Sequence, residues 1–283
     1  MTLSAIKVSA VVCTLNAEKN IEECLGSLRR NGVGEIILVD ADSKDKTREI
    51  SSKYADKILR DPRKGLAMAR NIGIAEASRE YILNFGSDNV MPEGTLEKML
   101  RWLKEKEYSG VSAMTYLKNP GKNYLSSAMN LYKKARYFPG ERDVIGTPTL
   151  FRTQLLRDFP YDNKMGWSDD GDLCDRLRYQ GHRFVICDAI VWEIGSEDIE
   201  SVFYRWKGYG RSDWEIYVKH SKGWPFLRRV KSFSHPLRNE LIHPFLRTPG
   251  LRRFAVLPFL LLITYMRYFS WIKHAIFGLE EKK

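Results

Sequence analysis

The stretch 84–89, NFGSDN, follows the apolar run YIL at 81–83 and contains one carboxylate, that of Asp88. Two carboxylates at the end of a strand would suit a divalent cation, but here Gly86 and Asn89 accompany the single aspartate. Mg²⁺ retains several waters and commonly binds one or two carboxylates together with substrate phosphates. One aspartate and an asparagine carbonyl can therefore suffice when a phosphorylated substrate supplies further oxygens. The alternative is an Asx-turn that binds no metal.

A second acidic cluster, made of Asp169, Asp170 and Asp172, lies in the stretch SDDGDLCDRL. Like charges at this spacing raise the pKa of at least one member, which favours a role as a proton acceptor. A general base must above all be positioned next to the reacting hydroxyl. The alternative is a helix whose first turn carries acids because they interact favourably with its macrodipole.

The first half of the chain alternates strand and helix signals that would position these residues. Strands alternating with helices of this kind predict an α/β fold with a mostly parallel sheet flanked by helices on both faces. In such sheets ligands bind at the carboxyl ends of the strands, where Thr14, Asn16, Asp40, Asp42 and Asp88 fall. The predicted strands cover 6–15, 35–40, 56–60, 80–86, 108–116 and 182–195, and the predicted helices cover 17–30, 43–55, 65–78, 92–106 and 168–181.

Five motifs together resemble a known family. In order they are VVCTLNAEKNIEECLGSL, EIILVDADSKDKT, GLAMARNIGIAEASREYILNFGSDN, FRTQLL and DDGDLCDRLRYQGHRF. Their order and spacing resemble the family 2 glycosyltransferases over residues 10–215. The resemblance implies the GT-A fold, which has a Rossmann-like sheet, and a nucleotide diphosphate-sugar as donor. It also implies a divalent cation, Mg²⁺ or Mn²⁺, and inversion at the anomeric carbon.

The resemblance implies that the first strand end and a later helix contact the donor. The positions that match the family's nucleoside pocket are Thr14, Asn16 and Glu18. Arg70 matches a position that faces the donor site, where a guanidinium could bind ribose or phosphate. The alternative for Arg70 is a solvated surface position.

The second strand end departs from the family pattern. Asp40 matches a residue that accepts hydrogen bonds from the base or ribose. The family usually has a second aspartate directly after it, where this chain has Ala41, and Asp42 follows one residue later. We expect Asp40 to act in donor binding and Asp42, with Ser43, to cap the following helix, a common use of these residue types.

The acidic motif of the family is also altered in this chain. Aligned on EYILNF, Gly86 replaces its first aspartate, Asp88 its central one and Asn89 the trailing one. The resemblance therefore assigns Ser87 and Asp88 to nucleotide-sugar binding and Asp88 to the metal. Family members often carry a histidine after the last strand, and Glu193 in AIVWEIG matches that place. Glu193 is then a candidate second metal ligand, the alternative being a pair with an arginine.

The segment SDDGDLCDRL resembles the Glu-Asp-x-Asp-Leu segment of the family. Asp170 takes the place of its catalytic base, and Asp169 takes the place of the glutamate and is a candidate acceptor or diphosphate contact. YRWKGYGRSD resembles the aromatic and basic segment near the acceptor. Further candidates for acceptor or diphosphate contacts are therefore Arg205, Trp206 and Arg211.

The C-terminal third carries the excess positive charge of the chain. The net charge is +11, and residues 201–283 hold 16 lysines and arginines against 5 acidic residues. The stretch 254–278 contains an apolar run interrupted by Pro258 and ended by Arg267. A full span needs about 20 apolar residues, so this run is too short unless flanking basic side chains snorkel. Its mixture of basic, aromatic and aliphatic residues is typical of a helix in the membrane interface; the alternative is a buried core helix.

We therefore predict a GT-A catalytic domain over 1–215 and a basic, aromatic, amphipathic membrane-interface segment over 216–283. The predicted function is metal-assisted, inverting transfer of a sugar to a hydroxyl of a lipid-linked, glycan or membrane-proximal acceptor. The four cysteines lack CxxC spacing, which favours an intracellular protein with reduced thiols. The expected location is the cytoplasmic face of the cell membrane, as a peripheral or monotopic protein.

Three alternatives remain at this point. A polyprenyl (dolichyl)-phosphate sugar synthase would use a phosphate acceptor, which is already ionised and needs no general base. A nucleotide-sugar-binding module without turnover is suggested by Gly86. A nucleic-acid binder would suit the basic C-terminal third, but nucleic acid has no use for the apolar run FAVLPFLLLI, so no nucleic-acid partner is expected.

Overall fold

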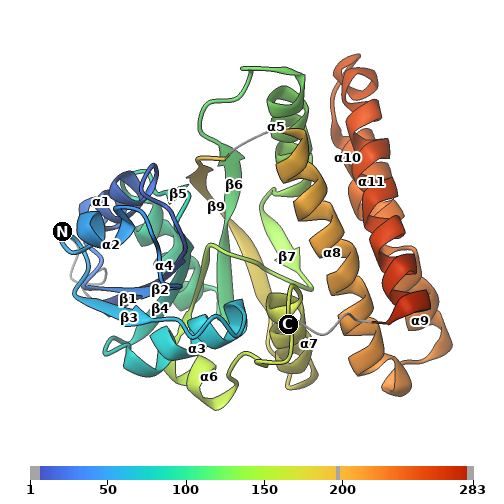
Figure 1. The fold of residues 1–283 in the computed structure, drawn as a ribbon. Helices are drawn as coiled ribbons and strands as arrows, with labels where there is room; N and C mark the ends of the chain where they lie inside the picture. The colour runs from blue at the N-terminus through green and yellow to red at the C-terminus, as the bar shows by residue number, and fades with distance from the viewer. Residues whose placement is uncertain (1–6, 196–197, 279–283) are drawn as a thin grey trace. The chain divides into compact units, whose positions relative to one another are not determined.

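The computed structural model describes residues 7–195 and 198–278, which form two compact units (Figure 1). Unit 1 comprises Met1–Lys118, Phe138–Met165 and Asp169–Gly195. Unit 2 comprises Asn119–Tyr137, Gly166–Ser168 and Ser196–Lys283. The predicted boundary at residue 215 falls inside the continuous helix α8 (Ile199–His220) and does not separate the two units.

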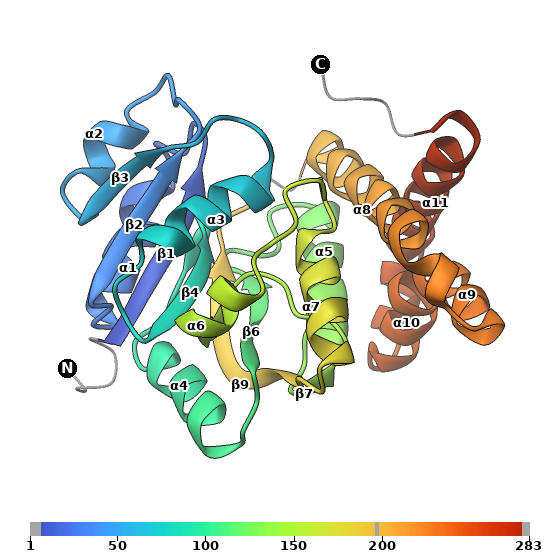
Figure 2. The same ribbon diagram turned by 90° about the horizontal axis from the view of Figure 1, so that it is seen from below.

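Within its described residues, unit 1 is built on one sheet of nine strands (Figure 2). The strand order is β3-β2-β1-β4-β8-β6-β9-β5, and β7 pairs with β9. The first four strands are parallel, whereas β8 runs antiparallel to both β4 and β6. The strands are β1 (Val8–Thr14), β2 (Glu35–Asp40), β3 (Lys57–Arg60), β4 (Tyr81–Gly86), β5 (Asn89–Val90), β6 (Gly110–Leu117), β7 (Gly140–Arg142), β8 (Thr149–Arg152) and β9 (Phe184–Glu193).

The predicted elements of the first half are present in the predicted order, although Ile6, the first residue of the first predicted strand, lies outside the described residues. The helix predicted over 43–55 is much shorter, because it begins only at Thr47 and ends at Ser51. The short strands β5, β7 and β8 were not predicted. The helices of unit 1 are α1 (Ile21–Arg30), α2 (Thr47–Ser51), α3 (Leu66–Glu76), α4 (Thr95–Glu105), α6 (Thr153–Asp158) and α7 (Asp169–Tyr179).

The side chains of β1 alternate between the two faces of the sheet and are apolar on both, which explains why helices cover both faces. Val8, Ala10 and Val12 are fully buried in the core that also contains apolar residues of α1 and α4. Val11 points to the opposite face, where α3 packs very closely: a Cβ on Gly73 would lie 2.4 Å from Val11 Cγ1. The small residues of α3 therefore let this helix lie directly on the sheet.

Unit 2 consists of helices in its described part. Its longest members, α8 and α11 (Arg252–Phe277), lie side by side (Figure 1). The others are α5 (Tyr124–Arg136), the 3₁₀ turn η2 (Ser221–Gly223), α9 (Phe226–Phe233), the π-helix η3 (Leu237–Ile242) and α10 (His243–Arg247).

Helix α11 has one buried face and one apolar face that is exposed. Among the described residues it is the one helix that is long and apolar enough to cross a membrane, and half of its most apolar stretch is buried inside the structure. Its exposed positions repeat at intervals of three and four residues, as expected for one side of a helix. They form the outward row Phe254, Pro258, Leu261, Tyr265, Phe269, Ile272 and Ile276.

Arg267 does not snorkel. It is buried, its Nε and Nη2 donate to Asp213 of α8 at 2.6 and 2.8 Å, and its Nη1 donates to Glu240 of η3. The arginine that ends the apolar run is therefore neutralised inside unit 2.

Candidate active site

Strand register brings the predicted strand-end residues of unit 1 to one edge of the sheet. Thr14 pairs with Asp40 across β1 and β2, and Cys13 pairs with Gly86 across β1 and β4. All three strands are parallel, so their carboxyl ends meet at this edge. The Thr14 hydroxyl is buried there without a hydrogen-bond partner in the described structure. A buried polar atom of this kind is costly unless a ligand or water satisfies it.

The loops after β1 and β2 are joined by the side chains predicted to contact the nucleoside. Asn16 Oδ1 accepts the Lys44 backbone N–H at 2.9 Å, and Glu18 Oε2 accepts that of Lys46 at 3.1 Å. Asn16 adopts a φ of 50°, a left-handed conformation that asparagine tolerates better than most residues. Both side chains are exposed, and they fix the rim of this edge.

Asp40 and Asp42 both belong to the turn after β2, and the role of Asp42 differs from the one expected. Asp40 is 2% exposed, and its two oxygens accept the Ser43 hydroxyl at 2.5 Å and the Ser43 backbone N–H at 3.0 Å. Asp40 therefore closes the turn after β2. Asp42 has a φ of 59° and pairs with Lys44 at 2.7 Å, and α2 begins only at Thr47. The prediction that Asp42 caps the following helix is therefore wrong.

The turn after β4 explains the glycine at the place of the missing aspartate. A Cβ on Gly86 would lie 2.2 Å from Asn89 Oδ1 and 2.7 Å from Asp88 Oδ1. The space of a side chain at position 86 is thus taken by the side-chain oxygens of Asp88 and Asn89. Gly86 is required by this arrangement, which gathers two hard oxygen atoms at the strand end.

Glu193 lies next to this turn. Its backbone pairs with Asn89 in the β5–β9 ladder, and the backbone N–H of Ile194 donates to the Asp88 carbonyl at 2.7 Å. Among the described residues no group of three or more His, Cys, Asp or Glu side chains has a metal-binding arrangement. Oxygen donors from Asp88 and Asn89 nevertheless fit the preferences of Mg²⁺ and Mn²⁺, which accept carboxylate and carbonyl ligands and complete their shells with water and phosphate.

Arg70 is not solvated, because it is buried and binds the acidic cluster. It is 6% exposed. Its Nη1 donates to Asp169 Oδ2 at 2.7 Å and to Asp170 Oδ1 at 2.9 Å, and its Nη2 donates to the Thr147 hydroxyl at 2.7 Å. Arg70 therefore positions two carboxylates and the solvated alternative is wrong, whereas contact between Arg70 and the donor stays a prediction.

The two neighbouring aspartates differ sharply in exposure. The Asp169 side chain is 4% exposed, whereas that of Asp170 is 23% exposed. Burial raises the pKa of Asp169 to about 6; Arg70 opposes this shift and the charge of Asp170 adds to it. Asp170 is the member of the pair that an incoming molecule can reach.

Tyr161 connects Asp170 to the sheet and was not found by sequence analysis. Its hydroxyl donates to Asp170 Oδ1 at 3.3 Å and accepts from Asn84 Nδ2 of β4 at 3.0 Å. Arg70 lies over its ring, 5.1 Å from the centroid. Asn71 holds its backbone, because Oδ1 accepts the Tyr161 N–H at 3.0 Å and Nδ2 donates to the Tyr161 carbonyl at 2.8 Å. Asn71 follows Arg70 in the RKGLAMARN stretch, and this motif was the sequence signal that could have led to Tyr161.

Hydrogen bonds leave one oxygen of Asp170 accessible. Within the described residues both side-chain donors, Arg70 and Tyr161, bind Oδ1. Oδ2 lies 3.4 Å from the place that a Cβ on Gly146 would take. The glycine keeps the space beside Oδ2 open, so this atom can accept a proton.

The weaker candidates Arg205, Trp206 and Arg211 all lie on α8 in unit 2. Trp206 is 1% exposed and donates its Nε1–H to Glu240 at 3.2 Å. This burial contradicts the prediction that Trp206 contacts an acceptor. Arg211 binds Glu215 at 3.0 Å, and Arg205 is half-buried on the same helix.

Glu215 of α8 holds the loop that leads to Asp169 in the chain. One oxygen, Oε2, accepts the backbone N–H groups of Gly166 at 3.0 Å and Trp167 at 3.2 Å, and the Ser168 hydroxyl at 2.8 Å. No motif indicated this residue.

A mixed sheet of this order, with acidic residues at the carboxyl ends of its parallel strands, is the arrangement of the GT-A fold. The family model described as Glycosyl transferase family 2 matches residues 9–159, more than half of the chain. The chain therefore belongs to glycosyl transferase family 2.

Relatives and solved structures agree with this membership. The chain is 34% identical over 107 residues to the dolichol-phosphate mannosyltransferase of Pyrococcus furiosus, covering 35% of this chain and 30% of the relative. It is 28% identical over 168 residues to the poly(ribitol-phosphate) beta-N-acetylglucosaminyltransferase TarS of Staphylococcus aureus, covering 54% of this chain and 29% of the relative. The match thus spans less than a third of the length of these relatives.

The structure of the mannosyltransferase PcManGT from Pyrobaculum calidifontis, in complex with GDP-Man and Mn²⁺, shares the fold. It superposes with a TM-score of 0.66 at 19% identity, covering 98% of this chain and 88% of that one.

Proposed function

We propose that this protein transfers a sugar from a nucleotide diphosphate-sugar to an acceptor hydroxyl, with inversion and with Asp170 as general base. The observation that carries the proposal is the position of Asp170. Arg70 and Tyr161 both donate to one of its oxygens, and its side chain is 23% exposed. A carboxylate fixed in this way is positioned before the substrate arrives.

In the proposed step one bond forms, one bond breaks, and a side chain of this protein takes the proton. The acceptor hydroxyl oxygen attacks the anomeric carbon from the face opposite the diphosphate, the bond from that carbon to the diphosphate oxygen breaks, and the hydroxyl proton moves to Asp170 Oδ2. Arg70 holds the Asp170 carboxylate in place through its hydrogen bond to Oδ1. Buried Asp169 balances the charge of Arg70.

The donor is expected at the shared strand edge. The unsatisfied Thr14 hydroxyl lies there, beside the rim held by Asn16 and Glu18. Asp88, with Asn89 and Glu193 as further candidates, would hold a divalent cation, and such an ion neutralises charge on a leaving diphosphate. The Mn²⁺ and GDP-Man in the PcManGT structure support this choice of donor class and ion.

The experiment compares Asp170→Asn with Asp143→Asn. Asp143 is a suitable control because its side chain is 70% exposed. We expect Asp170→Asn to lower turnover by about 10²-fold or more, while nucleotide-sugar binding in the presence of Mn²⁺, measured by thermal shift, stays within about twofold. Normal turnover of Asp170→Asn on a hydroxyl acceptor would overturn the proposal.

A second candidate is transfer to a polyprenyl phosphate, favoured by the similarity to a dolichol-phosphate mannosyltransferase. A phosphate oxygen is already ionised and needs no base. Retained activity of Asp170→Asn on a polyprenyl phosphate, with loss on hydroxyl acceptors, would select this candidate. Gly86 no longer argues for a non-catalytic binding module, because the Asp88 and Asn89 oxygens leave no space for a side chain at position 86.

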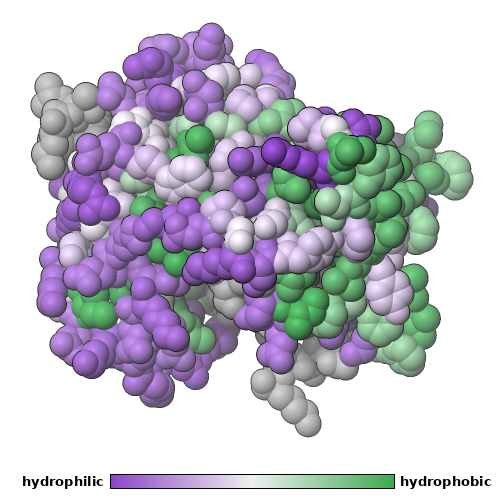
Figure 3. All heavy atoms as spheres, turned by 90° about the horizontal axis from the view of Figure 1, so that it is seen from above, coloured by the Kyte–Doolittle hydropathy of each residue, from purple (hydrophilic) through white to green (hydrophobic). Residues whose placement is uncertain are grey.

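We further propose that unit 2 lies on a membrane surface. The outward row of α11 joins other exposed apolar residues of unit 2, including Phe226 and Leu227 of α9, which are 80% and 81% exposed. Figure 3 shows hydrophobic atoms gathered over the C-terminal helices. Basic residues alternate with them in α9, whose sequence is FLRRVKSF. A helix of this composition binds lipid through its apolar face and anionic headgroups through its charges.

A further inference from the structure

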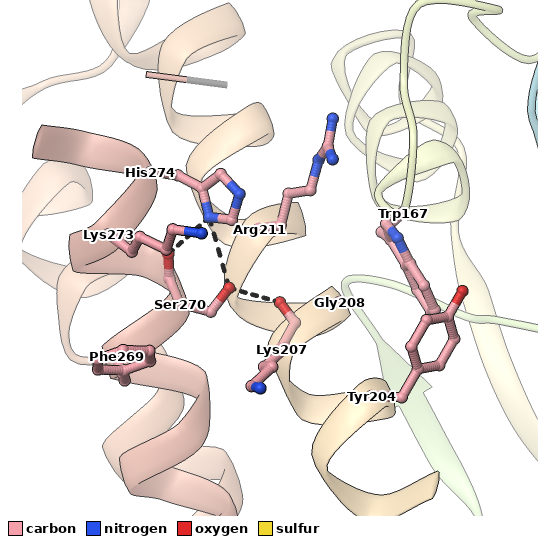
Figure 4. Close-up of a pocket in the computed structure, with 9 residues that line it drawn as sticks. All are labelled: Trp167, Tyr204, Lys207, Gly208, Arg211, Phe269, Ser270, Lys273 and His274. Atoms are coloured by element: carbon pink, nitrogen blue, oxygen red, sulfur yellow. Dashed lines mark hydrogen bonds between the residues drawn. The ribbon is translucent and has the colours of Figure 1, made fainter. Parts of the chain in front are cut away.

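A pocket of about 250 Å³ lies within unit 2, between α8 and α11 (Figure 4). It combines aromatic and basic side chains, and none of its nine lining residues is acidic. They are Trp167, Tyr204, Lys207, Gly208, Arg211, Phe269, Ser270, Lys273 and His274.

The walls of the pocket are fixed by specific contacts. A Cβ on Gly208 would lie 2.6 Å from the Trp167 ring, so only glycine allows the indole to lie against α8. Trp167 in turn meets Tyr204 edge-on, with ring centroids 5.1 Å apart. On the other side, the Ser270 hydroxyl donates to the Lys207 carbonyl at 2.7 Å, which ties α11 to α8.

The charge of the pocket is positive. Lys207 and Arg211 enter from α8 and Lys273 from α11. Glu215 pairs with the Nε of Arg211 but is itself 7% exposed and occupied by the 166–168 loop. Guanidinium and ammonium groups bind phosphate oxygens through short, charge-assisted hydrogen bonds. A phosphate is therefore the group that this set of cations best complements.

The pocket also opens next to an apolar surface. Phe269 lines it and belongs to the outward row of α11, where it is 48% exposed. A free phosphate would leave this apolar neighbour unused, whereas a phosphate that carries hydrocarbon chains would cover it.

We propose that this pocket binds the phosphate head group of an anionic glycerophospholipid, whose acyl chains lie along the outward row of α11. Arg211 and Lys273 bind the phosphate, Lys207 adds positive charge from the other end of the pocket, and Trp167 and Tyr204 cover the glycerol. The site is separate from sugar transfer, and it rests on the proposed membrane association for its access to lipid.

The test compares two double variants of the full chain that each remove two lysines. The pocket variant is Lys207→Ser with Lys273→Ser, and the matched control is Lys219→Ser with Lys222→Ser, at the end of α8 and in η2, outside the lining. Titration with monomeric dihexanoyl phosphatidic acid is followed by tryptophan fluorescence and thermal shift. We expect the pocket variant to bind this lipid at least about tenfold more weakly than wild type and the control to stay within about twofold, both with unchanged melting temperature in the absence of lipid.

Two results would overturn the proposal. An equal loss of affinity in both double variants would indicate general attraction between charges, which acts at about the same strength for each lysine near a surface. Inorganic phosphate that binds as tightly as the short-chain lipid would identify a site for a free anion. Nucleotide-sugar binding is measured in parallel without lipid, so failure of the pocket and failure of the proposed transferase activity are told apart.

Discussion

The Arg70 guanidinium carbon lies 5.1 Å from the centroid of the Tyr161 ring, and both side chains donate to the same oxygen of Asp170. One residue comes from the helix α3 and the other from the loop before α7, so the carboxylate is held from two directions. The hydroxyl of Tyr161 also accepts from Asn84 of β4. The position of Asp170 is therefore coupled to the sheet whose edge is the proposed donor site.

Replacement of Tyr161 by phenylalanine tests this coupling. Loss of the hydroxyl removes one bond to Asp170 and leaves Asn84 Nδ2 buried without its acceptor, which costs about 1–3 kcal/mol of the free energy of unfolding. We expect kcat to fall by about tenfold with a nearly constant KM for the donor. Tyr54→Phe is the control, because its hydroxyl reaches only an exposed glutamate. Unchanged kcat in Tyr161→Phe would show that Arg70 alone positions the base.

The raised pKa of Asp169 predicts a pH dependence of stability. Its pKa is about 6 in the folded protein and 3.8 for an unperturbed group, so the folded state binds more protons than the unfolded state between these values. This contribution to stability is complete below pH 3.8 and is lost as the pH rises through 6. The free energy of unfolding of wild type minus that of Asp169→Asn should therefore fall between pH 4 and 7. Urea denaturation at several pH values measures it, and a constant or rising difference would contradict the buried, desolvated environment of Asp169.

The crowded turn after β4 predicts that an aspartate cannot simply be restored at position 86. In Gly86→Asp the new Cβ would meet Asn89 Oδ1 at 2.2 Å, so Asn89 and Asp88 must move. We expect a loss of about 1–3 kcal/mol in stability and weaker, not stronger, binding of the nucleotide-sugar with Mn²⁺. Gly223→Ala is the control, since no atom lies within 4 Å of its Cβ position. Tighter Mn²⁺ binding by Gly86→Asp would contradict this prediction, because it would show that the turn accommodates the new side chain without a loss of free energy.

The outward row of α11 predicts a separation of membrane binding from folding. Leu261 and Tyr265 are 50% and 63% exposed, so Leu261→Glu with Tyr265→Glu should change the melting temperature little. Flotation with anionic vesicles should fall by at least about tenfold, because charged residues are expelled from the hydrocarbon boundary. Val144→Glu, at an exposed position of unit 1, should float like wild type. If both variants float equally well, α11 does not contact the membrane.

Sequence patterns predicted the parallel half of the sheet because local periodicity reports burial directly. The run EIILVD is a strand buried at every position, and Ile21, Leu25 and Leu28 share the buried face of α1. The antiparallel β8 was missed because its four residues, TLFR, carry no period of their own and their pairing with β4 and β6 is set by distant parts of the chain.

The same limit applies to the candidate site. Asp170 and Asp88 lie in stretches whose composition indicates chemistry, so the sequence alone identifies them as candidates. The Arg70–Asp169 pair joins residues 99 positions apart, and Tyr161 lies in a loop without a motif. Trp206 shows the opposite error, because an aromatic residue in a basic segment resembles a ligand contact until its burial in unit 2 is seen.

Arg267 has a consequence for how the protein matures. Its counter-charges, Asp213 and Glu240, stand on two other helices, so α11 carries an uncompensated cation until those helices have assembled around it. Insertion of an isolated α11 into the bilayer would place the charged Arg267 side chain in the lipid, which is unfavourable. If unit 2 binds the bilayer as proposed, its helices should therefore fold together in water first and bind the membrane afterwards, without the machinery that inserts hydrophobic segments into membranes.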